Sequence, residues 1–226
     1  MKIIAVLKKA CLTSPAAMKF FSMLYTVVGG NTFKIGRRNK FVHDKAFFRR
    51  CKIRIHGSNN HIFIEEGANL HNCIIAIHGS NNEIHLQKRC KLINSELYIE
   101  DDENRILIGE HTSLCGETHI ACTEGTEVII GKECLFSSQI YIRTGDSHSI
   151  LDENDNRINP AESVVISDRV WICNDAKILK GVKIPEKSIV ATGAVVTKKF
   201  EENNVILAGI PATIVKRNIS WKHEKI

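Results

Sequence analysis

The stretch Ile166–Val196, which reads ISDRVWICNDAKILKGVKIPEKSIVATGAVV, decides the fold because an aliphatic residue recurs in it at every sixth position. An α-helix repeats every 3.6 residues and a β-strand every two, so neither produces this spacing. A parallel β-helix does, since each short strand and its corner use six residues and place one aliphatic side chain inside. A second row, four positions later, carries small residues that suit tight corners. The aliphatic row is Ile166, Ile172, Ile178, Ile184, Val190 and Val196, and the small row is Val170, Ala176, Val182, Ser188 and Ala194.

The first half of the chain repeats with a period of 22 residues, and segments 55–62 and 77–84 (IHGSNNHI and IHGSNNEI) are near copies. A coil of three hexapeptides takes about eighteen residues, so the longer period predicts one coil plus a corner bulge. We place the bulges at 57–60, 79–82 and 101–104, where Gly and Asn tolerate left-handed backbone. Both repeat zones should form one solenoid, because a coil buries its apolar face only against its neighbours. The long-period rows are Ile62, Ile84, Ile106 and Val128; Ile64, Leu86, Ile108 and Ile130; and Leu70, Leu92, Leu114 and Phe136.

The length of 226 residues fits one all-β solenoid and leaves no room for a separate large catalytic domain. We expect an N-terminal helical cap at 1–34, the β-helix at 35–217 with a loop at 143–163, and a C-terminal tail at 218–226. No glycine-rich phosphate loop precedes the solenoid.

The N-terminus carries basic residues before the apolar run Phe20–Val28, which imitates a signal peptide. The run lacks an A-x-A cleavage site and is too short to span a membrane. Its apolar residues follow helical spacing, so we expect that face to cap the open end of the solenoid. The alternative is a peripheral membrane contact through a basic amphipathic helix. The basic residues are Lys2, Lys8, Lys9 and Lys19, and the apolar face is Phe20, Phe21, Leu24, Val27 and Val28.

The net charge of +6 and the pI of about 8.9 fit either plain solubility or attraction for an anionic ligand such as a nucleotide-bearing cofactor. The eight cysteines contain no C-x-x-C pair. Cys90 and Cys134 share a period-22 column with Ala68 and Thr112, which indicates a small packing site. We therefore expect reduced, structural cysteines and a cytoplasmic protein.

The six-residue rhythm breaks between Phe136 and Val164, and loops that leave a rigid scaffold often carry function. His148 is the only histidine in this segment, with Asp146 two residues before it and Arg143 five before it. In extended backbone Asp146 and His148 share a face, so the carboxylate would orient the imidazole or favour its charged form. The alternative is a solvated polar loop without a role.

Several motifs resemble the hexapeptide-repeat O-acetyltransferases, in particular those that modify bacterial capsular polysialic acid and lipopolysaccharide. The resemblance is dense over residues 105–217 and general before them. The co-occurrence of the Asp-Ser-His loop, Val-Trp-Ile and Gly-Ile-Pro-Ala makes it specific. The motifs are IRTGDSHSILD from Ile142, Arg157–Pro160, Val170–Ile172, Ile178–Ile184, Gly193–Lys198 and Ala208–Arg217.

This resemblance implies a homotrimer of left-handed parallel β-helices that binds acetyl-CoA between subunits and transfers the acetyl group directly to a saccharide hydroxyl. His148 would be the general base, Trp171 would lie in the active site, and Asp146 would be a possible orienting partner. Cys173, Ala191 and Ile210 depart from the residues usual in the family, and the first two add side chains where backbone often approaches the cofactor. Residues implied in cofactor binding are Gly193, Ala194, Lys198, Gly209, Pro211, Lys216 and Arg217.

Three other functions stay open. The first is transfer to an amino group of an amino sugar. The second is a zinc enzyme, since γ-class carbonic anhydrases share the solenoid and His56, His61 and His78 lie in the repeat. No third histidine has that family's spacing, so we expect no metal. The third is a non-catalytic scaffold that binds no acetyl-CoA.

Overall fold

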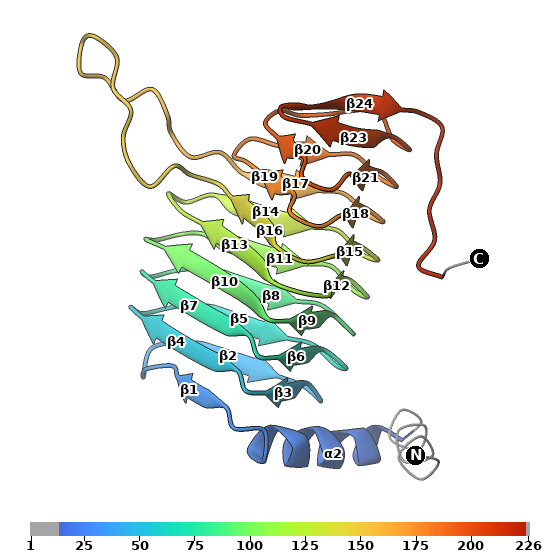
Figure 1. Cartoon of the computed structure of the whole chain (residues 1–226). Coiled ribbons are helices and arrows are strands. Elements are labelled where there is room, and N and C mark those ends of the chain that lie inside the picture. The colour runs from blue at the N-terminus through green and yellow to red at the C-terminus, as the bar shows by residue number, and fades with distance from the viewer. Residues whose placement is uncertain (1–13, 225–226) are drawn as a thin grey trace.

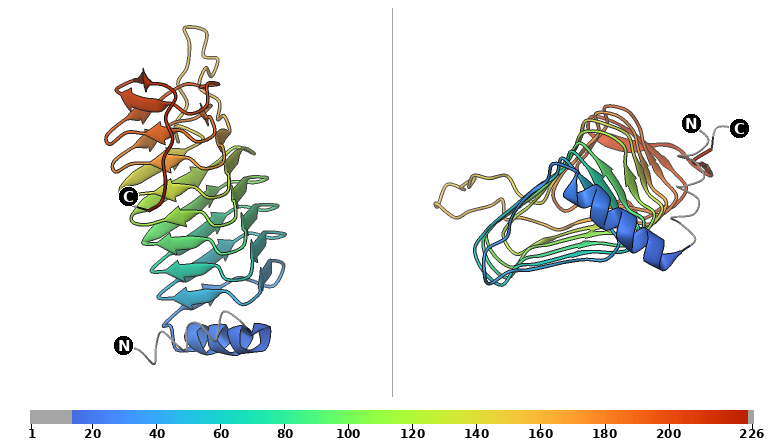
Figure 2. Two further views of the ribbon diagram at one scale, coloured as in Figure 1. Left: turned by 90° about the vertical axis from the view of Figure 1, so that its right-hand side faces the viewer. Right: turned by 90° about the horizontal axis from the view of Figure 1, so that it is seen from below.

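The chain bends at the end of every hexapeptide and returns one coil higher, so that it winds into a triangular prism (Figures 1 and 2). The computed structural model describes residues 14–224. Three sheets form the faces of the prism, and all their strand pairs are parallel except β23 with β24 at the C-terminal end. Over these residues the architecture is a left-handed parallel β-helix of about 8 turns with one short helix, as expected.

The eight-stranded sheet A consists of β1 (Thr32–Lys34), β4 (Lys52–His56), β7 (Ile74–His78), β10 (Ser95–Glu100), β13 (Thr118–Cys122), β16 (Ile140–Arg143), β19 (Lys177–Ile178) and β22 (Val195–Val196). The seven-stranded sheet B consists of β2 (Lys40–His43), β5 (His61–Ile64), β8 (Glu83–Leu86), β11 (Arg105–Ile108), β14 (Glu127–Ile130), β17 (Val164–Ile166) and β20 (Lys183–Ile184). The nine-stranded sheet C consists of β3 (Phe47–Arg49), β6 (Asn69–His71), β9 (Lys91–Ile93), β12 (Ser113–Leu114), β15 (Leu135–Phe136), β18 (Trp171–Ile172), β21 (Ile189–Val190), β23 (Ile206–Gly209) and β24 (Ala212–Lys216).

The core is made of the predicted rows. Every residue of the C-terminal aliphatic row has no exposed surface, and the small row at the corners is equally buried. The long-period rows pair in register, for example Ile84 with Ile106 and Ile106 with Val128. Because each coil covers the apolar edge of the one below, the interior is continuous from the first coil to the last.

The corner bulges contain a buried asparagine ladder that the sequence pattern predicted only as a turn. Asn60, Asn82 and Asn104 stack one above another and are at most 1% exposed. Asn82 Nδ2 donates to Asn60 Oδ1 (3.0 Å) and to the Asp101 carbonyl (2.9 Å), while Asn82 Oδ1 accepts from the backbone N–H of Asn104 (2.8 Å). The amide side chains thus satisfy backbone groups that the bulge removes from the sheets.

Glycine is required at the start of the first two bulges. Gly57 has φ of 129°, and a Cβ there would lie 1.9 Å from the carbonyl oxygen of Gly79. In the third bulge Asp101 stands at this position, with φ of 63°, and its carboxylate bonds to the next coil. This change begins the polar network beneath the loop.

The helix α2 (Pro15–Val27) lies across the first coil, but with a different face inward than we predicted (Figure 1). Met18 and Ser22 are buried, and the Tyr25 ring contacts that of Phe47 at 5.8 Å between centroids. The predicted capping face is largely exposed, because Met18, Ser22 and Tyr25, on a neighbouring face of the helix, are the side chains that pack on the first coil. Its exposed fractions are 56% for Phe20, 47% for Leu24, 76% for Val27 and 71% for Val28.

Three lysines of the proposed basic segment, Lys2, Lys8 and Lys9, lie outside the described residues, as does Cys11. Among residues 14–224, no helix combines the length and apolar character needed to cross a membrane.

Most described cysteines occupy the core positions that the column analysis predicted. Cys90 and Cys134 have no exposed surface, and burial raises the pKa of each thiol to about 12. Cys115 is exposed and Cys173 is half-buried, so the packing interpretation was wrong for Cys115. It directly follows Leu114, the last residue of β12, whose side chain points into the core, and its own side chain points outward.

The asparagine ladder yields a stability prediction. Asn82→Asp keeps the shape of the side chain but replaces two donated hydrogen bonds with a buried charge facing two oxygen atoms. We expect a loss of about 3 kcal/mol in the free energy of unfolding, measured by urea denaturation. The matched control is Asn81→Asp, one residue away, where the side chain is exposed and keeps its role as acceptor from Asn59 Nδ2. Equal stability of the two variants would contradict a structural role for the ladder.

Candidate functional site

The chain leaves the prism after β16 and rejoins it at β17, so the segment 144–163 forms a loop that projects from the corner between sheets A and B (Figures 1 and 2). The loop begins at the buried Thr144 and contains Asp146 and His148, whose side chains are exposed. Three large apolar side chains on the loop are also exposed: Ile150 (56%), Leu151 (50%) and Ile158 (59%).

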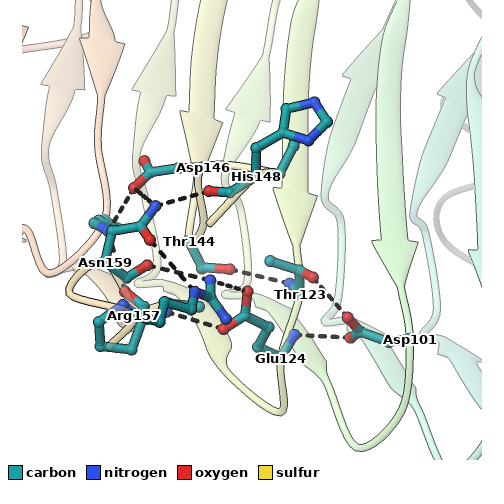
Figure 3. Close-up of polar contacts among 12 residues, drawn as sticks. Asp101, Thr123, Glu124, Thr144, Asp146, His148, Arg157 and Asn159 are labelled. Atoms are coloured by element: carbon teal, nitrogen blue, oxygen red, sulfur yellow. Dashed lines mark hydrogen bonds and ion pairs between the residues drawn. The ribbon is translucent and has the colours of Figure 1, made fainter. Parts of the chain in front are cut away.

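Asn159 holds the two sides of the loop together, although the sequence analysis gave it no role of its own. It is 6% exposed. Its Nδ2 donates to Asp146 Oδ2 and to the carbonyl of His148, both at 2.9 Å, and its Oδ1 accepts from the N–H of Ile150 at 2.7 Å (Figure 3). The backbone on both sides of His148 is therefore fixed by one amide side chain.

Asp146 does not orient the imidazole in the way we expected. Its carboxylate accepts from Asn159 and from Lys180 Nζ (2.6 Å), and the His148 ring points away from it (Figure 3). Ser147, with φ of 65°, turns the backbone between them, so the two residues do not share a face as they would in an extended strand. Asp146 is linked to the backbone of His148 through the side chain of Asn159.

A second set of contacts anchors the loop to the coils below. Arg157 Nη2 donates to Glu124 Oε1 at 2.6 Å, and Glu124 Oε2 accepts from the N–H of Ala161 at 3.2 Å. The backbone N–H of Glu124 donates to Asp101 Oδ1 at 2.7 Å, and Thr123 Oγ1 donates to Asp101 Oδ2 at 2.9 Å (Figure 3). The loop is thereby connected to the third asparagine bulge.

The electrostatics of this network favour its ionised form. The hydrogen bond from Lys180, followed by that from Asn159, lowers the pKa of Asp146. The hydrogen bond from Arg157 lowers the pKa of Glu124 in the same way. Both carboxyl groups stay charged at neutral pH, which keeps the loop contacts intact.

Trp171 lies on β18 in sheet C, on a different face of the prism from the His148 loop. Its Nε1 is buried without a hydrogen-bond partner among the described residues, and its ring lies 6.0 Å from that of Trp221. Trp221 belongs to the C-terminal tail, which runs back along sheet C (Figure 2), and its Nε1 donates to the carbonyl of Arg169 at 2.8 Å. One chain therefore does not bring Trp171 and His148 together.

The residues expected to bind the cofactor lie in the last coils and differ in accessibility. Ala194 is buried in the core, so only its backbone can meet a ligand, whereas Gly193 occupies an open corner with φ of 69°. Lys198 and Lys216 are exposed, and Arg217 Nε is bonded to Glu202 Oε2 at 3.0 Å. Gly209 ends β23, and Pro211 stands in the hairpin between β23 and β24.

The histidines considered for zinc are arranged along the outside of the prism. His56 and His78 stack with their centroids 5.0 Å apart on sheet A, and His61 lies on sheet B. In the part of the chain that the structure describes, no three His, Cys, Asp or Glu residues converge as metal ligands.

By its fold the chain belongs to the left-handed parallel β-helix proteins, and it carries a histidine-bearing loop at one corner. Comparison with known proteins shows which of these proteins it resembles. The chain is 34% identical over 100 residues to a polysialic acid O-acetyltransferase of Escherichia coli O1:K1 / APEC, a match that covers 44% of this chain and 32% of that protein. It is 33% identical over 116 residues to the putative lipopolysaccharide biosynthesis O-acetyl transferase WbbJ of Escherichia coli K12, covering 47% and 56%. These matches thus span 32% and 56% of the length of the two relatives.

The crystal structure of the polySia-specific acetyltransferase NeuO superposes with a TM-score of 0.70 at 28% identity, covering 86% of each chain. No protein-family model matches the sequence. The chain is related in sequence and in fold to the hexapeptide-repeat O-acetyltransferases, as the motifs predicted.

The loop anchor predicts a local effect of changing Asn159. In Asn159→Ala the N–H of Ile150 loses its acceptor, and we expect its hydrogen exchange to accelerate at least tenfold, which corresponds to about 1.4 kcal/mol. The control is Asn156→Ala in the exposed turn of the same loop. Unchanged exchange at Ile150 would mean that the loop is held by other contacts.

A second prediction concerns the Asp146–Lys180 pair. The folded pKa of Asp146 lies below the unfolded value of about 3.9, so the pair stabilises the loop at neutral pH and this contribution is lost as the pH falls through the folded pKa. Lys180→Met should raise the pKa of Asp146, measured from its carboxyl ¹³C shift. Lys177→Met, which removes a pair with Asp175, should leave it unchanged. A titration of Asp146 identical in both variants would disprove the coupling.

Proposed function

We propose that this protein transfers the acetyl group of acetyl-CoA to a hydroxyl of a bacterial surface saccharide of the capsule or lipopolysaccharide type, in the cytoplasm. The observation that carries the proposal is the His148 loop, fixed by Asn159 at the corner of a fold whose related proteins are named O-acetyltransferases. An exposed imidazole on a rigid loop is suited to accept a proton from a hydroxyl at neutral pH.

The chemistry needs no covalent enzyme intermediate. As the saccharide oxygen attacks the thioester carbonyl, its proton passes to the His148 imidazole, a C–O bond forms and the C–S bond breaks. The imidazole then returns the proton to the departing CoA sulfur, so the histidine ends neutral. A backbone N–H would stabilise the oxyanion during attack.

The last coils offer features that suit a CoA-type donor. Gly193 leaves open space where a Cβ would stand, and the exposed ammonium groups of Lys198 and Lys216 are available for phosphate groups. These residues would hold the donor, which supplies the activated acetyl group. The half-buried Cys173 adds a side chain near the Val-Trp-Ile motif, and burial raises the pKa of its thiol, so it is a poor nucleophile.

We also propose a homotrimer in which each site is built by two copies. The exposed Ile150, Leu151 and Ile158 give the loop an apolar surface that a neighbouring copy would cover. Trp171 lies on another face of the prism from His148, so its participation requires a second chain.

For the helix α2 we propose a peripheral membrane contact, because the apolar face formed by Phe20, Leu24 and Val27 is exposed.

The first test is turnover of acetyl-CoA on a saccharide panel, followed through the free CoA thiol. His148→Ala should lower the rate by about 10²–10⁴ because the general base is lost. His85→Ala, which removes an imidazole bonded to Glu65 on sheet B, should have no effect. Wild-type turnover that survives in His148→Ala would refute the assignment of the base. A faster reaction with amino sugars would favour the N-acetyltransferase alternative.

The second test addresses the shared site. His148→Ala and Trp171→Ala should each be inactive alone, and unfolding and reassembling them together should restore activity. In a mixed trimer, some sites combine His148 from one copy with Trp171 from another. If the mixture stays inactive while mixed trimers form, the site does not join these residues from two chains.

A further inference from the structure

A hollow of about 300 Å³ lies on the outer face of sheet A, directly below the His148 loop. It exists because Ala121, on β13, stands between two large side chains in the same outward row: Tyr98 on β10 below and Arg143 on β16 above. The small methyl group leaves the space between them empty. Gly145 and Ser147, the residues that lead to His148, form its upper rim.

The walls of the hollow carry aromatic faces and hydrogen-bonding groups. The Tyr98 and His119 rings stack with centroids 6.4 Å apart, and His119 continues to Tyr141 at 5.0 Å. The carboxylates of Glu96 and Glu100 line the same space. Aromatic rings beside carboxylates suit a sugar, which offers C–H groups to the rings and hydroxyl donors to the carboxylates.

Arg143 is the basic side chain on the lining of the hollow. Arg143 Nε is buried and has no hydrogen-bond partner in the described part of the chain, while its Nη2 donates to Ser147 Oγ. The guanidinium carbon lies 5.6 Å from the centroid of the Tyr141 ring, so a cation–π contact accompanies the hydrogen bond to Ser147. Arg143 therefore gives the hollow a positively charged wall whose position is fixed by two contacts.

The charge balance selects among sugars. Glu96, Glu100 and Asp101 lie around Tyr98. Burial is the largest cause that raises the pKa of its phenol, and the negative charge of these carboxylates raises it further. His119 Nδ1 is hydrogen-bonded to Glu96 Oε2 at 3.0 Å, and Arg143 is the one guanidinium on a lining that contains the carboxylates of Glu96 and Glu100. A sugar with its own carboxylate would meet net repulsion here, whereas a neutral sugar would not.

We propose that the hollow over Ala121 is the binding subsite for one neutral sugar unit of the acceptor. This rests on the proposed function, whose base, His148, directly follows Ser147 of the rim in the sequence. The proposed acceptor is neutral, whereas one relative, the polysialic acid O-acetyltransferase, is named for an acidic polymer.

The test is binding, measured without acetyl-CoA by isothermal titration. The probes are the methyl glycosides of galactose, glucose and N-acetylglucosamine, with methyl sialoside as the anionic counterpart. At least one neutral glycoside should bind, and Ala121→Leu should weaken it at least tenfold by filling the hollow. The matched control is Ala76→Leu, an equally covered alanine two coils below in the same row, which should bind as wild type does. Thermal denaturation verifies that both variants fold.

A further variant tests the charge argument. Glu100→Gln should strengthen binding of methyl sialoside and leave that of the neutral glycosides within a factor of three. The proposal is overturned if no neutral glycoside binds, if both leucine variants bind equally well, or if wild type prefers the sialoside. Because binding requires no transfer, an inactive protein that binds a neutral glycoside in this hollow would refute the proposed function and leave the subsite standing.

Discussion

The whole molecule depends on the stacking of identical positions in successive coils. Each inward aliphatic side chain, such as Ile106, is buried only because Ile84 lies one coil below and Val128 one coil above. Parallel strands lie about 4.8 Å apart, so every feature outside the prism inherits this regular spacing. A solenoid of this kind is stabilised by neighbour contacts alone, and it tolerates a departure from the repeat wherever the inward row continues.

The candidate site uses that tolerance in two ways. The chain inserts a loop between β16 and β17 while Val128 and Val164 still pair in register, so the core is not interrupted. In the outward row of sheet A, Ala121 stands between Tyr98 and Arg143, and its small side chain leaves the hollow beneath the loop. The loop itself is anchored by Asn159 above and Asp101 below. The histidine, its supporting contacts and the adjoining cavity are thus consequences of local changes on a fixed scaffold.

The sequence predicted the repetitive part of the structure well because repetition is visible in one dimension. The rows at periods of six and 22 specified the strands, the buried residues and the position of the break in the repeat. The sequence did not predict contacts that depend on the exact path of an irregular segment. Ser147 in the left-handed region separates Asp146 from His148, and no periodic pattern reveals a positive φ at a serine.

Other errors have the same origin. The helical spacing of Phe20, Leu24 and Val27 is real, but which face of α2 meets the first coil depends on where Phe47 and Phe48 lie. Asn159 lies in the Arg157–Pro160 motif, and only the four hydrogen bonds of its side chain in the folded chain reveal it as the anchor of the loop. Trp171 and Trp221 are 50 positions apart and meet through the return of the tail along sheet C.

The measurement that tests the central claim most directly is a crystal structure of the protein with CoA and the neutral saccharide that binds best. The account predicts one sugar unit over Ala121 and an acceptor hydroxyl within about 3 Å of a ring nitrogen of His148. A saccharide bound with its hydroxyl beyond the reach of His148, against another face of the prism, would contradict the account.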